Sequence, residues 1–133
     1  MLVKDIINAI ESVAPPIYQE IYDNCGLQVG DVCAEVTGVL ISLDVTEAVL
    51  HEAIERKCNM IVAHHPLIFS GLKKIMGRNY VERIVQKAIK NDVNIYAAHT
   101  NLDNMYEGVN ARIAQKLDLQ NIRRDTDLLR QRA

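Results

Sequence analysis

Two adjacent histidines, His64 and His65, are the residues of this sequence best suited to chemistry. They follow the apolar run Met60–Ala63 and precede Pro66, so they stand at the end of an expected buried strand. Imidazole nitrogen is a good ligand for zinc, iron, nickel, cobalt and manganese. Side chains of successive residues in an extended chain point to opposite sides. The two rings therefore meet at one ion only where the backbone leaves strand geometry, and otherwise they favour two ions close together.

Polar side chains also follow the two neighbouring apolar runs. Residues 93–98 are followed by His99, with Asp103 four positions later, and residues 36–43 are followed by Asp44. Ligands of open parallel sheets bind beyond the carboxyl ends of the strands, where the loops converge. We therefore predict that the histidine pair and Asp103 bind metal. His99 is predicted to be a hydrogen-bond partner of a ligand or a general acid or base, ahead of a direct ligand.

Each of these residues also has a purely structural interpretation. One histidine of the pair could be a core residue bonded to a backbone carbonyl, with the other facing solvent. The metal interpretation is favoured because two consecutive histidines beside proline are joined by His99 and Asp103 at the next strand end. Asp44 is more simply explained by the turn into a helix capped by Thr46, and it stays a reserve candidate. His51, on that expected helix, is predicted to be a surface residue.

The remaining sequence alternates between helical and strand patterns. Apolar residues recur every three to four positions, as on one face of a helix, in residues 2–13, 46–57, 79–90 and 107–117. Continuous apolar runs predict strands at residues 36–43, 60–63 and 93–98, the first of them buried on both faces. The alternation predicts an α/β fold with a mostly parallel sheet and helices on both faces.

Other polar clusters are more simply structural. Residues 22–30, rich in Asp, Asn and Gly, are expected to form tight turns. The three cysteines lack C-x-x-C spacing and are expected to be reduced packing thiols, with Cys58 as a metal ligand the weaker alternative. Lys73 and Lys74 are expected to be solvated rather than to attract an anionic substrate.

Size and composition limit the class of protein. A chain of 133 residues predicts one domain, and a net charge of −2 gives no argument for nucleic acid or an acidic membrane. No apolar run approaches the ~18 to 20 residues of a membrane helix, and the first residues carry charges where a signal peptide is apolar. We therefore expect a cytoplasmic protein. The arginines of residues 120–133 are expected to lie in a solvated tail, with a phosphate-binding arm as the alternative.

Four segments, in order along the chain, resemble one protein family. They are residues 23–30 (DNCGLQVG), 42–46 (SLDVT), 63–69 (AHHPLIF) and 99–103 (HTNLD). Together they resemble the GTP cyclohydrolase 1 type 2 homolog family, also known as NGG1-interacting-factor-3-like proteins, over most of residues 1–117. The resemblance implies one α/β lobe of a normally two-lobed fold that carries a dinuclear metal centre, in proteins that form toroidal homohexamers.

The resemblance also implies site residues and a function. His64, His65 and Asp103 match the family's first-half metal ligands, for two divalent ions per complete site, which would be Zn, Fe, Mn, Ni or Co. It implies a metal-dependent hydrolase that acts on a nucleotide or related small molecule, with His99 handling protons as the catalytic residue. The alternative is a non-catalytic metal-binding scaffold or a regulatory protein-interaction module.

The resemblance further implies ligands that this sequence does not supply. Family members continue into a second lobe, where a late histidine and glutamate complete the metal site. No histidine follows His99 here. We therefore expect residues 1–119 to be the amino-terminal metal-binding lobe and residues 120–133 the start of a missing second lobe, and whether these residues alone are an enzyme is left open.

Overall fold

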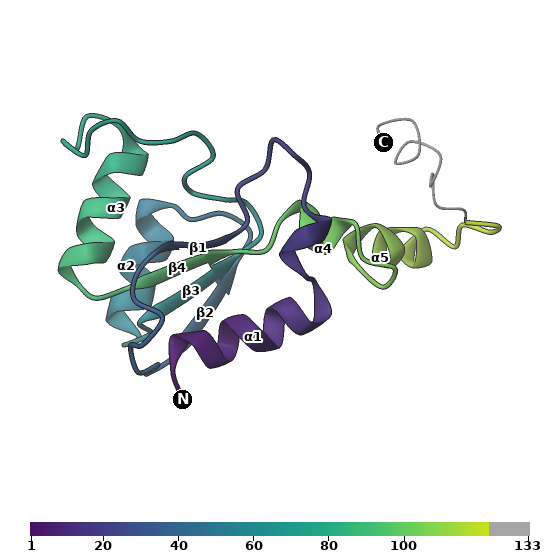
Figure 1. The fold of residues 1–133 in the computed structure, drawn as a ribbon, viewed down its shortest axis with the longest axis horizontal. Helices are drawn as coiled ribbons and strands as arrows, with labels where there is room; N and C mark the ends of the chain where they lie inside the picture. Colours follow the sequence, from purple (N-terminus) through teal and green to yellow (C-terminus); the bar gives the residue numbers. More distant parts are fainter. Residues whose placement is uncertain (123–133) are drawn as a thin grey trace.

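A four-stranded sheet forms the centre of the structure, a computed structural model that describes residues 1–122 (Figure 1). The strands are β1 (Gly26–Val29), β2 (Val39–Ser42), β3 (Met60–Ala63) and β4 (Asn94–Ala97). They lie in the order β1-β4-β3-β2, with β2, β3 and β4 parallel and β1 antiparallel to β4. The predicted α/β fold with a mostly parallel sheet is confirmed.

Helices cover both faces of this sheet (Figure 1). One face packs against α1 (Val3–Val13), and the other packs against α2 (Glu47–Glu55) and α3 (Tyr80–Lys90). Three smaller elements lie beyond the sheet: η1 (Pro16–Tyr18), α4 (Thr100–Asp103) and α5 (Val109–Lys116). The arginines of residues 123–133, for which a tail was predicted, lie outside the described residues.

Side-chain caps begin the two crossover helices, at Thr46 as predicted and at Asn79. The Thr46 hydroxyl accepts a hydrogen bond from the Val49 N–H at 3.1 Å, and the Asn79 side chain accepts one from the Glu82 N–H at 2.9 Å. Each cap satisfies an N–H group that has no partner inside its own helix. Because both helices start after a strand end, they bring the chain back for the next parallel strand.

Alternate residues of the two central strands enter two separate cores. Ile61, Ala63 and Ile95 pack against α2 and α3, whereas Met60 and Tyr96 pack against α1. All five side chains are at most 2% exposed. This burial on both faces fixes β3 and β4 firmly, and the loops that leave their carboxyl ends therefore start from rigid positions.

Two expectations about strands are wrong. Residues 26–29, expected within tight turns, form β1, because they pair with β4 far along the chain. Residues 36–43 shorten to β2, which is not buried on both faces: Ile41 is 81% exposed. Ile41 pairs with Val62 at the edge of the sheet, on the face where α1 packs against the central strands and leaves this edge uncovered. The short helix α4 was not predicted.

Candidate metal centre

The histidine pair lies at a bend directly after β3. The His64 N–H donates to the Ser42 carbonyl at 3.2 Å and the His65 N–H donates to the Leu43 carbonyl at 2.9 Å, so both residues stay attached to the end of β2. The two ring centroids are nevertheless only 5.1 Å apart. The backbone has left strand geometry, and both rings face one region. The two rings therefore do not diverge as expected, and the number of ions stays a prediction.

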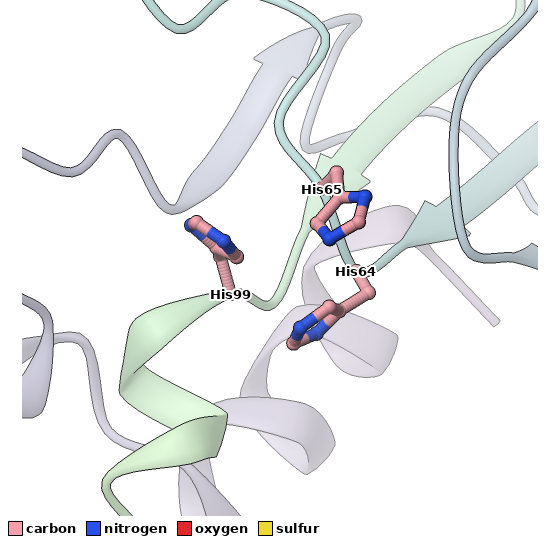
Figure 2. A group of neighbouring side chains, drawn as sticks. All are labelled: His64, His65 and His99. Carbon is pink, nitrogen blue, oxygen red and sulfur yellow. The ribbon is translucent and has the colours of Figure 1, made fainter. Parts of the chain in front are cut away.

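A third ring, that of His99, completes a cluster at this edge of the sheet. Its centroid is 5.2 Å from that of His64 and 5.6 Å from that of His65. Figure 2 shows the three rings around a common space at the ends of β3 and β4. One potential ligand atom of each residue lies within 4.8 Å of the others, so the triad could hold a metal ion.

Each ring is oriented by a hydrogen bond at Nδ1. The acceptors are the Ala98 carbonyl for His64 at 2.9 Å, Asp44 Oδ1 for His65 at 2.7 Å and Asp23 Oδ1 for His99 at 2.9 Å. A carbonyl or an ionised carboxylate can only accept, so Nδ1 carries the proton in all three neutral rings. The Nε2 lone pairs are consequently left for a cation, which is the usual arrangement of metal-binding histidines.

Asp103, the predicted carboxylate ligand, lies beside the triad at the end of α4. Its Oδ1 atom is 3.6 Å from His64 Nε2, which is too long for a hydrogen bond. The Asp103 side chain is 26% exposed and the His64 side chain 19% exposed. The structure thus brings together all four predicted site residues, and their individual roles stay predictions.

Asp23, expected to lie in a tight turn, also belongs to this site. Its side chain is fully buried, and its Oδ2 atom accepts from the Thr100 N–H at 3.0 Å, from the Thr100 hydroxyl and from the Cys25 thiol at 3.1 Å. Burial opposes ionisation, but the hydrogen bonds from His99, Thr100 and Cys25 outweigh it and hold the pKa of Asp23 below its usual range. Burial also raises the pKa of the Cys25 thiol.

Most of the residues expected to have structural or minor roles lie beside the triad or on the surface of the protein. Asp44, the reserve candidate, contacts His65 as described above. His51 is exposed on α2, and its Nε2 atom lies 3.3 Å from Glu55 Oε1. Cys33 is exposed rather than packed, and all three cysteines are free. Cys58 belongs to no cluster of potential metal ligands in the described part of the chain. Lys73 and Lys74 are exposed.

Comparison with known families gives a decisive match. Residues 1–128 match the family described as Duf34/NIF3 (NGG1p interacting factor 3). This chain belongs to that family. A Clostridium acetobutylicum protein named "GTP cyclohydrolase 1 type 2 homolog" is 44% identical over 115 residues, which are 86% of this chain and 43% of the relative. A Staphylococcus epidermidis protein of the same name is 40% identical over 122 residues, 92% of this chain and 33% of the relative.

Solved structures of Duf34/NIF3 relatives share the fold. A Bacillus cereus protein related to NIF3 matches with a TM-score of 0.85 and 47% identity, over 91% of this chain and 33% of that protein. Reduced HcgD from Methanocaldococcus jannaschii matches with a TM-score of 0.84 and 34% identity, over 91% and 48% respectively. The chain thus spans between a third and a half of these proteins, which is consistent with one lobe of a longer fold.

The helices give no indication of a membrane span. Within residues 1–122, none is both long and apolar enough to cross a bilayer.

Proposed function

We propose that this Duf34/NIF3 chain forms part of a divalent-metal centre in a hydrolase that acts on a nucleotide or a related small molecule. His64, His65 and Asp103 are the proposed ligands. The observation that carries the proposal is the convergence of three imidazole rings, each with Nδ1 already bonded to an acceptor. A core histidine needs a partner at one nitrogen, but three such rings sharing one space are not required for packing.

The donor set fits a divalent transition metal. Imidazole nitrogen with one carboxylate suits zinc, iron, manganese, nickel or cobalt better than calcium or magnesium, which prefer oxygen ligands. We propose two ions per complete site. This chain spans only 33% to 43% of its curated relatives, so further ligands would come from the remaining length of such proteins or from a neighbouring subunit.

The bound ion and the residues of this chain would then have different roles in the reaction. A bound divalent ion would polarise a carbonyl or phosphoryl group of the substrate and make water a better nucleophile. His99 can accept a proton at Nε2, because its Nδ1 is held by Asp23. Its ring lies as close to the pair as a third ligand would, so metal analysis of His99→Ala separates the two roles.

Metal analysis of protein purified without chelators tests the site. We expect at least about half an equivalent of a transition metal per chain in the wild type, and its loss in His65→Ala. His51→Ala is the matched control, since His51 is exposed on α2 and is not part of the histidine triad. If the wild type contains less metal than this, and His65→Ala contains the same amount, the proposal is wrong.

Activity and assembly form the next part of the proposal. Metal-loaded protein should hydrolyse a member of a panel of nucleotides, including GTP, and His99→Ala should lower turnover more than it lowers metal content if His99 handles protons. We also propose a cytoplasmic homohexamer. Light scattering coupled to size-exclusion chromatography measures the oligomeric state directly. A wild-type chain that is monomeric and still binds metal would show that the metal site does not depend on the hexamer.

A second candidate function is a metal-binding scaffold that contacts other proteins. It is favoured by large apolar side chains left in solvent, above all Ile17 at 85%, Ile21 at 93% and Ile41 at 81% exposure. Surfaces of this kind are covered in stable assemblies. Metal binding without turnover on any nucleotide or phosphoester would favour this candidate over the hydrolase.

A further inference from the structure

We propose that Asp23 is a positioning residue of the metal centre, which fixes the tautomer and orientation of His99 through a buried carboxylate. The inference rests on the proposed metal centre for its functional meaning, but the state of the His99 ring can be measured without metal. It makes the loop before β1 part of the site, although that loop contributes no ring to the triad.

The contacts of Asp23 leave its carboxylate a single orientation. Oδ1 lies 2.9 Å from His99 Nδ1 and accepts from the Asn24 N–H at 2.7 Å. Oδ2 is taken by the Thr100 N–H and hydroxyl and by the Cys25 thiol. Both oxygens are therefore used by fixed donors. Since the side chain is fully buried, water does not compete for either of them.

This contact gives His99 an electronic character that the other two rings lack. A carboxylate on Nδ1 holds the proton there and adds negative charge behind the ring, which makes Nε2 a stronger electron donor. The effect is larger where solvent is excluded. His64 has only a neutral carbonyl at Nδ1, and the Asp44 side chain behind His65 is 56% exposed. Of the three ring contacts, the Asp23–His99 pair is thus the one with a buried charge.

A purely structural role is the rival explanation, because Asp23 also ties the loop before β1 to Thr100. The two roles differ in what they demand of the side chain. A structural tie needs acceptors for the Thr100 donors, and Thr100→Val removes one of those donors without touching the histidine. Positioning needs an acceptor without a proton at Oδ1. Asp23→Asn keeps the shape but introduces an NH₂ group, which can donate to Nδ1 and turn the ring to the opposite tautomer.

Nitrogen-15 spectra of the histidine rings, in metal-free protein of the full chain, test the positioning directly. We expect wild-type His99 to carry its proton on Nδ1, Asp23→Asn to shift it to Nε2, and Thr100→Val to leave it on Nδ1. A wild-type His99 protonated at Nε2 overturns the inference without any variant, so a variant that fails to fold does not leave it untested.

Zinc titration then gives the functional consequence. If His99 binds the ion directly, Asp23→Asn should weaken Zn²⁺ binding about 10-fold to 100-fold, the range seen when partners of metal-binding histidines are removed, whereas Thr100→Val should change it less than about threefold. Where His99→Ala itself loses metal, equal Zn²⁺ affinity in wild type and Asp23→Asn overturns the positioning role, even if the variant melts at a lower temperature. If the wild type binds no Zn²⁺ while its His99 tautomer is as expected, the metal centre fails and the ring assignment stands.

Discussion

Polar side chains gather at both ends of the central strands, but only one end leaves nitrogen atoms for a ligand. At the amino ends, Asn94 accepts from the Asp31 N–H at 2.8 Å and donates to the Asn59 carbonyl at 2.9 Å. Asn59 in turn accepts from the Thr37 N–H and donates to the Glu35 carbonyl. At the carboxyl ends, carboxylates and a carbonyl hold the three histidines instead.

The difference shows how a polar cluster becomes a candidate site. Each amide at the amino ends uses its oxygen and its nitrogen on backbone groups, so the cluster holds loops together and has little capacity left. Each imidazole at the carboxyl ends makes its hydrogen bond through Nδ1, which leaves its Nε2 atom for another partner. Within residues 1–122, the cluster of potential metal ligands therefore lies at the carboxyl ends of the strands, and the amide cluster at the amino ends anchors loops.

The largest expected effect follows from removing a ring at the carboxyl end. His64→Ala should weaken Zn²⁺ binding at least about 100-fold, because it removes one nitrogen of the cluster and the contact with Asp103. Asn59→Ala is the control at the amino end and should leave Zn²⁺ affinity unchanged in the folded protein. Competition titration with a zinc indicator measures both. Similar losses in the two variants would break the distinction between the ends.

The next largest effect is expected at the amino ends of the central strands, and it concerns stability rather than metal binding. A Cβ atom at Gly30 would lie 2.1 Å from Asn94 Oδ1, and Gly30 has a φ of +130°. Gly30→Ala should therefore lower the free energy of unfolding by about 3 kcal/mol, from overpacking and backbone strain together. Gly71→Ala is the matched control, since its Cβ would meet nothing within 4 Å. Denaturant unfolding measures the change.

Metal binding by the Gly30 variant tests whether the two ends of the sheet act independently. Folded Gly30→Ala protein should bind Zn²⁺ as the wild type does, because the strained contact lies at the opposite end of the sheet. A loss of Zn²⁺ affinity in fully folded variant would mean that the two ends are coupled through β1 and β4, and the separation of roles would fail.

The two ends also differ in how far the sequence predicts them. The histidine pair was predicted because the apolar run Met60–Ala63 marks a strand, and polar residues after a strand in a parallel sheet converge. Asp23 was missed because its partner His99 is 76 residues away in sequence, and an Asp-Asn-Cys-Gly segment equally fits a turn. β1 was missed for the same physical reason: four residues, beginning with glycine, become a strand only through pairing with β4.

A smaller effect is expected at the exposed carboxylate behind His65. Asp44→Asn should weaken Zn²⁺ binding by about threefold to 10-fold, less than Asp23→Asn, because the Asp44 and His65 side chains are 56% and 46% exposed and solvent screens the pair. The difference from wild type should shrink further in high salt. Zn²⁺ titrations at low and high ionic strength check this, and an Asp44→Asn effect larger than that of Asp23→Asn would reverse the proposed order.

The smallest effect is expected at a carboxylate that holds a loop in place but contacts no histidine ring. Glu82, near the start of α3, accepts from the Arg78 N–H at 2.9 Å and the Met76 N–H at 3.0 Å. These two hydrogen bonds, with that of Arg78 the stronger cause, lower the pKa of Glu82 against the opposing effect of burial. A carboxyl whose pKa is lower in the folded state stabilises the fold above its unfolded pKa, and this contribution is lost as pH falls through the folded value.

Glu82→Gln should therefore melt at a lower temperature than wild type near pH 7, and the two melting curves should converge as the pH falls below about 4. Glu107→Gln is the control, because Glu107 is exposed and accepts no hydrogen bond within residues 1–122. Zn²⁺ affinity should be the same in all three proteins at neutral pH. If Glu82→Gln lost Zn²⁺ as Asp23→Asn is expected to, loop anchoring alone would explain the Asp23 effect, and the special role of the buried carboxylate on His99 would have to be given up.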